Sequence, residues 1–247
     1  MTVESTLQKL NELKLYSMEK MYMDQISDPA FKELSFDDRL SLMIDGEWLR
    51  RQNSRLNRLM TNAQFKMSQA CVEDIHYYED RKLDKAFITK LSTCNFVAEN
   101  QNVIIKGASG NGKSYLACAL GVSACRNNYS VRYVRLTELL DELAVARLNG
   151  TYQKTMKVYR KIKLLILDEW LLVSLDEMQA RDLLEIVESR HMTSSTIFCS
   201  QFDTAGWYEQ IGESTLADAI IDRIIHSSHN ILIDGKISMR ERLGLHS

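Results

Sequence analysis

Apolar residues recur at helical spacing through the first part of the chain. Leucines lie three residues apart near the N-terminus, at Leu7, Leu10 and Leu13. Ser35 followed by Asp38 is a capping box, which predicts a long helix that begins there and continues to about Lys66. The one proline, Pro29, precedes this helix. We therefore predict a small all-helical N-terminal domain over residues 1–70.

From about residue 100 the pattern changes to short β-branched runs separated by helical stretches. The runs predict strands at 102–106, 130–135, 164–167, 195–200 and 230–234. Strands that alternate with helices favour a parallel sheet covered on both faces. We therefore predict an α/β fold with a five-stranded parallel sheet for residues 71–247.

The strongest chemical signal follows the first predicted strand. Residues 107–114 read Gly-Ala-Ser-Gly-Asn-Gly-Lys-Ser, between an apolar run and a helical stretch. This is the strand–loop–helix context of a P-loop, whose backbone N–H groups surround phosphate oxygens at a helix N-terminus. Lys113 can reach the β- and γ-phosphates of ATP, and the Ser114 hydroxyl can ligate Mg²⁺. The predicted nucleotide-binding residues are Gly107, Ala108, Ser109, Gly110, Asn111, Gly112, Lys113, Ser114 and Tyr115.

Acidic side chains end another predicted strand. The apolar run 164–167 leads directly into Asp168 and Glu169, at the sheet edge where ligands bind in such folds. We expect Asp168 to hold Mg²⁺ and Glu169 to orient and deprotonate the attacking water. A solvated acidic turn is the alternative interpretation. Ser200 and Gln201 end a further strand and could contact the γ-phosphate or the water.

Composition excludes some classes of protein. Hydrophobic residues make up 45% and charged residues 26%, as in ordinary globular proteins. The net charge of -2 excludes nucleic-acid binding through global charge, although local basic patches are still possible. There is no apolar run long enough for a membrane span, and no signal peptide is predicted. Five cysteines without a C-x-x-C pair indicate reduced thiols, so we expect a cytoplasmic protein.

Two clusters of basic residues have no acid within them. One lies between residues 48 and 66 and the other between residues 154 and 163. Either could contact phosphates of a nucleic acid, while a solvated helix face is the usual explanation for such runs. The candidate DNA contacts are Arg50, Arg51, Arg55, Arg58, Lys154, Lys157, Arg160 and Lys161.

The chain resembles the IstB-type transposition helper ATPases of bacterial insertion sequences, which are relatives of the helicase loader DnaC in the AAA+ initiator clade. The resemblance covers nearly the whole chain. Its most specific part is the run Ala-Asp-Ala-Ile-Ile-Asp-Arg at 217–223, together with Ser-Met-Arg at 238–240. Other supporting segments lie at 34–40, 72–75, 81–84, 165–170, 200–201 and 207–208.

This resemblance implies an AAA+ domain with a shortened C-terminal lid, in which strand 195–200 lies between the P-loop strand and the acidic strand. Ser200 and Gln201 would form the sensor that reads the γ-phosphate. Arg223 would match an arginine finger that acts on ATP bound by a neighbouring subunit, and Arg240 a sensor arginine. The family often has two aspartates after the acidic strand, where this chain has an Asp-Glu pair.

The resemblance also implies a function. Segment 137–161 would be a helical insertion that lines a ring or spiral of subunits and contacts duplex DNA. The protein would oligomerise on target DNA with ATP and Mg²⁺, recruit a transposase, and hydrolyse ATP to release or reset the complex. A DnaC-like helicase loader is the alternative, with the N-terminal helices holding a hexameric helicase. A metabolic P-loop kinase would need an acceptor pocket, which the sequence does not identify.

Overall fold

The computed structural model describes residues 2–212, 214–235 and 237–244. The chain divides into two compact units, Met1–Arg58 and Leu59–Ser247. This division comes earlier than the boundary expected near residue 70. Ala63 and Ala70 are fully buried in the second unit, and the Phe65 ring lies against Gly121 there. No helix in the described ranges has the length and apolar character to cross a membrane.

The N-terminal unit is helical, as predicted. Its elements are α1 (Val3–Glu12), α2 (Tyr16–Ser27), η1 (Pro29–Glu33) and the first part of α3 (Phe36–Ala63). Ser35 caps this helix as predicted, because its Oγ accepts a hydrogen bond from the Asp38 N–H at 3.1 Å. The Asp38 carboxylate accepts from the Ser35 hydroxyl at 2.6 Å, instead of from the Ser35 N–H as in a full capping box. The two buried polar residues described in this unit are Gln25 and Glu47.

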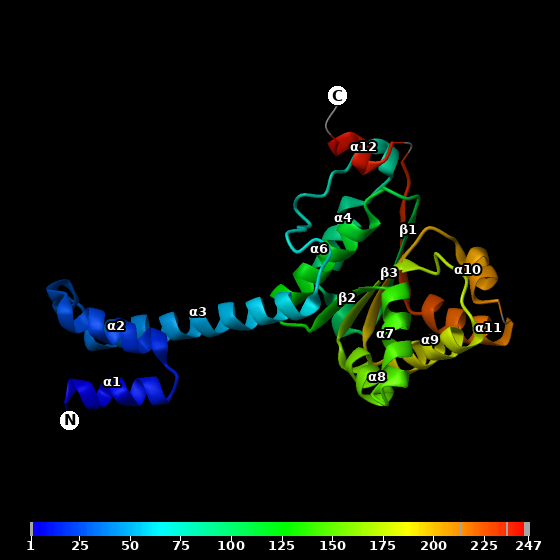
Figure 1. Ribbon diagram of the computed structural model, residues 1–247. Coiled ribbons are helices and arrows are strands. Elements are labelled where there is room, and N and C mark those ends of the chain that lie inside the picture. Colours follow the sequence, from blue (N-terminus) through cyan, green and yellow to red (C-terminus); the bar gives the residue numbers. More distant parts are fainter. Residues whose placement is uncertain (1, 213, 236, 245–247) are drawn as a thin grey trace. The chain divides into compact units, whose positions relative to one another are not determined.

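The second unit is built on a five-stranded sheet whose strands all run parallel (Figure 1). The sheet order is β2-β3-β4-β1-β5. This confirms the predicted fold, including the position of β4 between the P-loop strand β1 and the acidic strand β3. The strands are β1 (Asn102–Gly107), β2 (Val131–Arg135), β3 (Leu164–Trp170), β4 (Ser195–Ser200) and β5 (Ser228–Ile233).

Helices cover both faces of this sheet (Figure 1). One layer is formed by α6, with α4 against it, and the other by α7, α8, α9, α10 and α11. The helices of the second unit are η2 (Glu79–Arg81), α4 (Lys85–Ser92), α5 (Asn95–Ala98), α6 (Lys113–Arg126), α7 (Leu136–Leu148), α8 (Tyr152–Lys161), α9 (Glu177–Arg190), α10 (Thr204–Ile211), α11 (Ser214–Ile225) and α12 (Met239–Leu243).

An aromatic cluster fixes the carboxyl ends of the central strands. The Trp170 ring meets Phe198 edge-on, with centroids 4.6 Å apart, and Trp207 at 5.8 Å. All three rings are buried. Because Trp170 ends β3 and Phe198 lies in β4, this cluster holds the two strand ends in place next to the loops that follow them.

Candidate functional site

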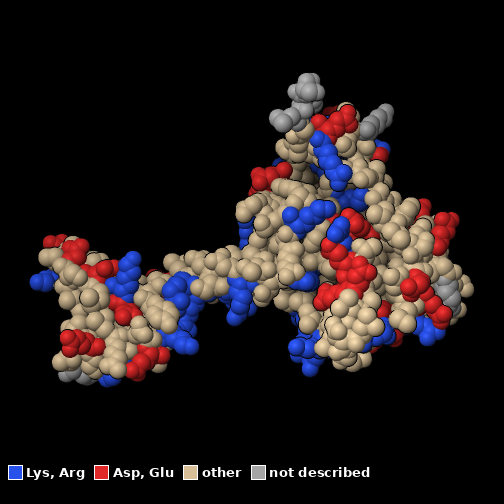
Figure 2. All heavy atoms as spheres, in the orientation of Figure 1, with Lys and Arg blue, Asp and Glu red and all other residues tan. Residues whose placement is uncertain are grey.

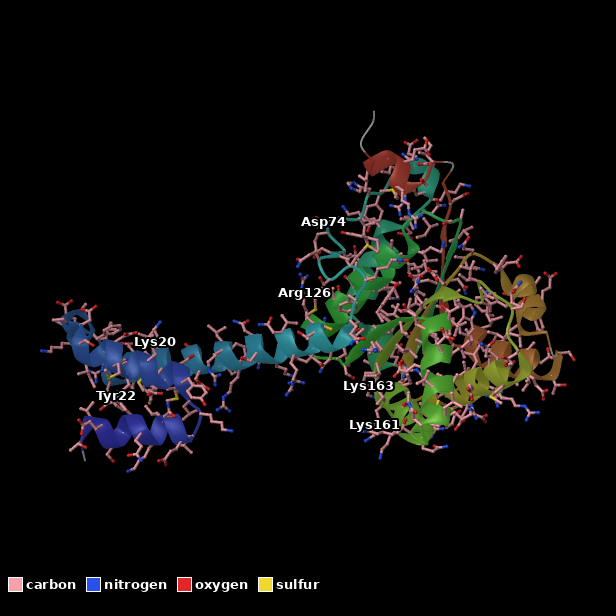
Figure 3. The ribbon with its side chains drawn as sticks, in the orientation of Figure 1. Lys20, Tyr22, Asp74, Arg126, Lys161 and Lys163 are labelled. Atoms are coloured by element: carbon pink, nitrogen blue, oxygen red, sulfur yellow. The ribbon has the colours of Figure 1, made fainter. Side chains whose placement is uncertain are left out.

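A cavity of about 720 Å³ is lined by the residues that follow β1, β3 and β4. Its volume lies in the range of small-ligand sites, and its place at the carboxyl ends of parallel strands is where such folds bind ligands. Three further segments contribute to its lining: 66–67, 74–76 with Arg81, and, from the C-terminal part, Met239, Arg240, Leu243 and Gly244. Asp74, labelled in Figure 3, belongs to the loop before α4 that forms one wall.

The P-loop closes tightly at its first glycine and is held by its own lysine. A Cβ atom on Gly107 would lie 2.4 Å from the carbonyl oxygen of Ile233 in β5, so only glycine fits there. Lys113 Nζ donates to the carbonyl oxygens of Gly107 at 2.7 Å and Ala108 at 2.9 Å. Burial lowers the pKa of Lys113. The Lys113 ammonium is therefore held by hydrogen bonds to the loop, beside the place where phosphates would lie.

The predicted nucleotide-binding residues divide into two sets. Gly107, Ala108 and Asn111 form the back of the loop, and they are not among the residues that line the cavity. The α6 N-terminus begins at Lys113 and points its free N–H groups at this space. The predicted residues that line the cavity are Ser109, Gly110, Gly112, Lys113, Ser114 and Tyr115.

Asp168 and Glu169 both line the cavity, although consecutive residues of a regular strand point to opposite faces. A bulge explains this. The β3–β4 register shifts between Leu167 and Trp170, and Glu169 has a positive φ of 54°. Such a bulge redirects side chains, and a non-glycine residue in this conformation is strained. The strain lies at Glu169, to which the sequence assigns the catalytic base.

Asp168 is 2% exposed, and neutral donors surround its carboxylate. Oδ2 accepts from the Ser114 hydroxyl at 2.6 Å and from the Tyr133 hydroxyl at 2.6 Å. Oδ1 accepts from the Glu169 N–H at 2.9 Å. The serine–aspartate pair is the set of hard oxygen ligands that Mg²⁺ prefers, so these residues fit the predicted metal.

Sequence reasoning missed Tyr133. This residue lies in β2, beside β3, and is 6% exposed. Burial and the hydrogen bond to Asp168 raise the pKa of Tyr133, so its phenol stays a donor. A buried tyrosine in a strand needs a partner for its hydroxyl, which is the one available sequence signal. The pattern cannot name that partner, because it comes from another strand.

The structure corrects the role expected for Ser200. Its side chain is fully buried, and it is absent from the cavity lining. Ser200 Oγ accepts from Trp207 Nε1 at 2.9 Å and from the Phe202 N–H at 3.1 Å, and it donates to the Trp170 carbonyl at 3.3 Å. Its hydrogen-bonding capacity is thus used within the aromatic cluster. Gln201, the next residue, lines the cavity and is the one that can contact a ligand.

The short C-terminal helix α12 docks directly on the P-loop. The Met239 N–H donates to the Gly110 carbonyl at 2.9 Å. Arg242 pairs with Asp80, and its guanidinium lies 4.4 Å from the Tyr78 ring centroid. Arg240, on the same helix, lines the cavity, and its role as a sensor stays a prediction.

Arg223 lies on α11, outside the cavity of its own chain. Its Nη1 donates to the Ala219 carbonyl at 2.8 Å, and its Nη2 lies 3.3 Å from Glu188 Oε1. The side chain is 30% exposed and Glu188 is 60% exposed. Both contacts are local and leave part of the guanidinium open to solvent.

The basic clusters contain both free and engaged side chains. Arg50 and Arg51 bond to Glu47, and Arg160 pairs with Glu185. No ion pair is found in the described part of the chain for the exposed residues Arg55, Arg58, Lys154, Lys157 and Lys161.

The three free lysines are placed together on one helix. Met156 and Tyr159 anchor the inner face of α8, so Lys154, Lys157 and Lys161 lie on its outer face. Lys161, labelled in Figure 3, is the last residue of α8. On the face drawn in Figure 2, basic and acidic side chains alternate rather than form one positive surface. DNA contact would therefore depend on local clusters.

The chain is similar to proteins of insertion sequences and to replication AAA+ proteins. An insertion sequence ATP-binding protein of Sinorhizobium fredii is 40% identical over 242 residues, which cover 98% of each chain. The DnaC helicase loader has a TM-score of 0.58 at 18% identity, covering 67% of this chain and 97% of that one. A replication initiator DnaA structure, with AMPPCP and single-stranded DNA, has a TM-score of 0.58 at 20% identity.

The DnaA match covers 70% of this chain but only 52% of the DnaA chain, so this chain spans about half the length of that initiator. At these identities the two structures show a common fold alone. The P-loop, the acidic pair and the parallel sheet make the protein an ATPase of the AAA+ fold. The family model described as "IstB-like ATP binding protein" matches residues 8–247, and the chain belongs to that family.

Proposed function

We propose that the protein is an ATP-dependent helper of transposition that assembles on duplex DNA, recruits a transposase and resets by hydrolysing ATP. The observation that carries this proposal is the similarity to an insertion sequence ATP-binding protein over 98% of both chains. The exposed lysines of α8 support the DNA-binding part. The partly exposed Arg223, outside its own cavity, supports assembly into oligomers.

Hydrolysis would use groups that the fold already holds in place. The amides of the P-loop and Lys113 bind the β- and γ-phosphates, for which Lys113 leaves the carbonyls of Gly107 and Ala108. Glu169 orients a water molecule and takes its proton as the oxygen attacks the γ-phosphorus and ADP leaves. Most of the catalytic effect comes from positioning and from charge stabilisation.

The metal part of the proposal rests on two residues. Ser114 and Asp168 would hold Mg²⁺, since their oxygens already lie together at the cavity. When bound there, Mg²⁺ would offset negative charge on the phosphates. Tyr133 keeps the Asp168 carboxylate in place through its own hydrogen bond.

The alternative function is a helicase loader. The fold shared with the DnaC helicase loader favours it, although that likeness concerns architecture alone. The two functions differ in the protein that is captured. ATP-loaded complexes on duplex DNA should retain the transposase of the same insertion sequence in a pull-down and should not retain a hexameric replicative helicase. If the complexes retain the helicase and not the transposase, the protein is a helicase loader and not a transposition helper.

A salt titration tests the DNA contact. Lys157→Gln with Lys161→Gln removes two exposed charges of α8, and each phosphate contact contributes about 0.9 to the slope of log affinity against log salt. We therefore expect the slope for ATP-dependent duplex binding to fall by about two, with no dependence on DNA sequence. Lys85→Gln with Lys90→Gln, on α4, removes the same charge elsewhere and is the matched control. Equal slopes in the two double variants would reject α8 as the contact.

A further inference from the structure

A buried guanidinium lines the cavity beside the P-loop. Arg81, at the end of η2, is 5% exposed. Its Nη2 donates to the Asn111 carbonyl at 2.9 Å, and its Nη1 donates to the His76 carbonyl. Both acceptors are neutral backbone groups. Its Nε is buried and has no hydrogen-bond partner.

Arg81 also lacks a direct ion pair. Within the described ranges no ion pair joins it to a carboxylate, and the neighbouring Asp80 pairs with Arg242 instead. Burial lowers the pKa of Arg81, but arginine starts so high that the guanidinium stays charged at neutral pH. Keeping a cation out of water without a directly paired anion is costly, and an anionic ligand in the adjoining cavity would offset that cost.

Arg190 provides the contrast within the same unit. It is also buried, at 2% exposure, and is remote from the cavity lining. Its Nε donates to Thr196 Oγ1 at 3.0 Å, and its terminal nitrogens donate to three backbone carbonyls. A buried guanidinium away from the cavity lining can thus have all three of its nitrogens bonded in this fold. Arg81 differs because part of its donor set is unused and because it lies at the ligand cavity.

The P-loop leaves room for this side chain. Gly112 has a φ of 88°, and a Cβ atom there would lie 2.9 Å from Arg81 Nη2. Lys113 is bonded to carbonyls at the start of the loop, whereas Arg81 is bonded to the carbonyl of Asn111 near its end. The loop therefore has one buried cation at each end.

We propose that Arg81 is a nucleotide-binding residue, whose guanidinium supplies a second positive charge, besides Lys113, to the phosphate chain. This deepens the proposed function and rests on the nucleotide occupying this cavity. The N–H groups of the terminal nitrogens that are not used on the two carbonyls bond to phosphate oxygens. The ligand thus supplies an anion in direct contact with Arg81.

Ligand binding to the intact protein tests this role. We expect Arg81→Gln to weaken both ATP and inorganic tripolyphosphate by a similar factor, roughly 10- to 100-fold, as for a lost hydrogen bond to a charged group. Tripolyphosphate carries the charge without base or ribose. Arg81→Lys keeps the charge but not the planar fork, so its affinity for both ligands should lie between those of the unaltered protein and Arg81→Gln. Lys82→Gln is the control, because Lys82 is the adjacent exposed cation.

The outcomes separate this inference from the site itself. Tripolyphosphate affinity equal to that of the unaltered protein in folded Arg81→Gln overturns the inference, even if ATP binds more weakly, since Arg81 would then act on the nucleoside and not on the phosphates. If Arg81→Gln does not fold, unchanged affinity for both ligands in Arg81→Lys has the same meaning. Lys113→Ala checks the cavity, because unchanged binding of both ligands there would reject the P-loop as the phosphate site.

Discussion

Three neutral groups hold the buried carboxylate of Asp168: the Ser114 and Tyr133 hydroxyls and the Glu169 N–H. Their hydrogen bonds fix its position without neutralising its charge. A cation that enters the cavity therefore meets a carboxylate that is already oriented. Preorganisation of this kind reduces the reorganisation needed when charge arrives. Tyr133 is the one of the three donors that has no other proposed role.

Tyr133→Phe should weaken metal-dependent binding. The ring still fills its place, but one hydrogen bond to the carboxylate is lost, which is worth about a factor of ten. We expect the Mg²⁺ concentration that gives half-maximal ATP binding to rise by about that factor, while binding in EDTA is unchanged. Fluorescence titration with an ATP analogue measures both.

Tyr159→Phe is the matched control for this change. It also removes a buried phenol that donates to a carboxylate, that of Glu142, in a part of α8 away from the cavity lining. Its Mg²⁺ midpoint should match that of the unaltered protein. Equal midpoints for Tyr133→Phe and Tyr159→Phe would leave Tyr133 with a purely structural role.

Single residues also show what a sequence can predict about a site. The P-loop spacing and the acidic pair after an apolar strand are local patterns, and the structure places Lys113, Asp168 and Glu169 around one cavity. Tyr133 and Arg81 are contributed by other segments, so no local pattern identifies them. Their part in the site depends on strand order and on how the chain before α4 returns to the P-loop.

At the scale of elements, the geometry of α3 gives two arginines of its basic cluster a partner within the protein. Arg50 and Arg51 follow Glu47 at i+3 and i+4, which places all three on one side of the helix. Glu47 lies just outside the run counted between residues 48 and 66. It accepts from both arginines and, at 3.1 Å, from the Ser17 N–H at the start of α2. We therefore assign these two arginines first to holding the helical unit together.

This cluster predicts an acid-sensitive N-terminal unit. The arginines lower the pKa of Glu47 to about 2, chiefly through the hydrogen bond from Arg50. Its folded pKa is below the unfolded value, so the stabilisation is complete above about pH 4.5 and is lost as pH falls toward 2. Hydrogen exchange of peptides from residues 14–50, normalised to an unstructured reference peptide, should show protection falling over this window.

Glu47→Gln supplies the test of that assignment. It removes the titrating group, so protection in residues 14–50 should be lower at pH 6 and should change little between pH 5 and pH 3. Asp45→Asn is the control, since Asp45 lies on the same helix and is exposed. A pH profile that survives in Glu47→Gln would place the acid sensitivity elsewhere.

At the scale of the whole molecule, periodicity was enough to predict the class of fold but not the order of strands. Alternating strands and helices favour a parallel sheet, and the observed strands overlap the five predicted runs. Nothing in that alternation places β4 between β1 and β3, and this expectation came from the family resemblance. The boundary between the two units also depends on contacts between residues far apart in the sequence. The residues after Arg58 join the second unit through buried side chains such as that of Ala63.

Oligomeric ATP hydrolysis can be tested through Arg223, whose contacts within its own chain are weak. An exposed ion pair such as that with Glu188 contributes about 0–1 kcal/mol to stability. A finger that acts on a neighbour's γ-phosphate contributes roughly 10³–10⁵ in turnover. Arg223→Ala should therefore leave folding and ATP affinity nearly unchanged and lower steady-state hydrolysis by at least about 10³-fold. Arg181→Ala, which breaks a similar exposed pair with Glu177, should hydrolyse ATP normally.

Mixing two inactive variants tests whether Arg223 acts between subunits. Arg223→Ala retains its cavity, and Lys113→Ala retains its arginine, so in a mixed assembly some interfaces join an intact cavity to an intact arginine. If mixed assemblies form, as labelled subunits can show, ATPase activity should reappear and be highest near equal proportions. An arginine that acts within its own chain cannot restore activity in this way, since every chain with an intact cavity lacks it. Inactive mixtures that contain co-assembled subunits would thus reject an action of Arg223 between subunits.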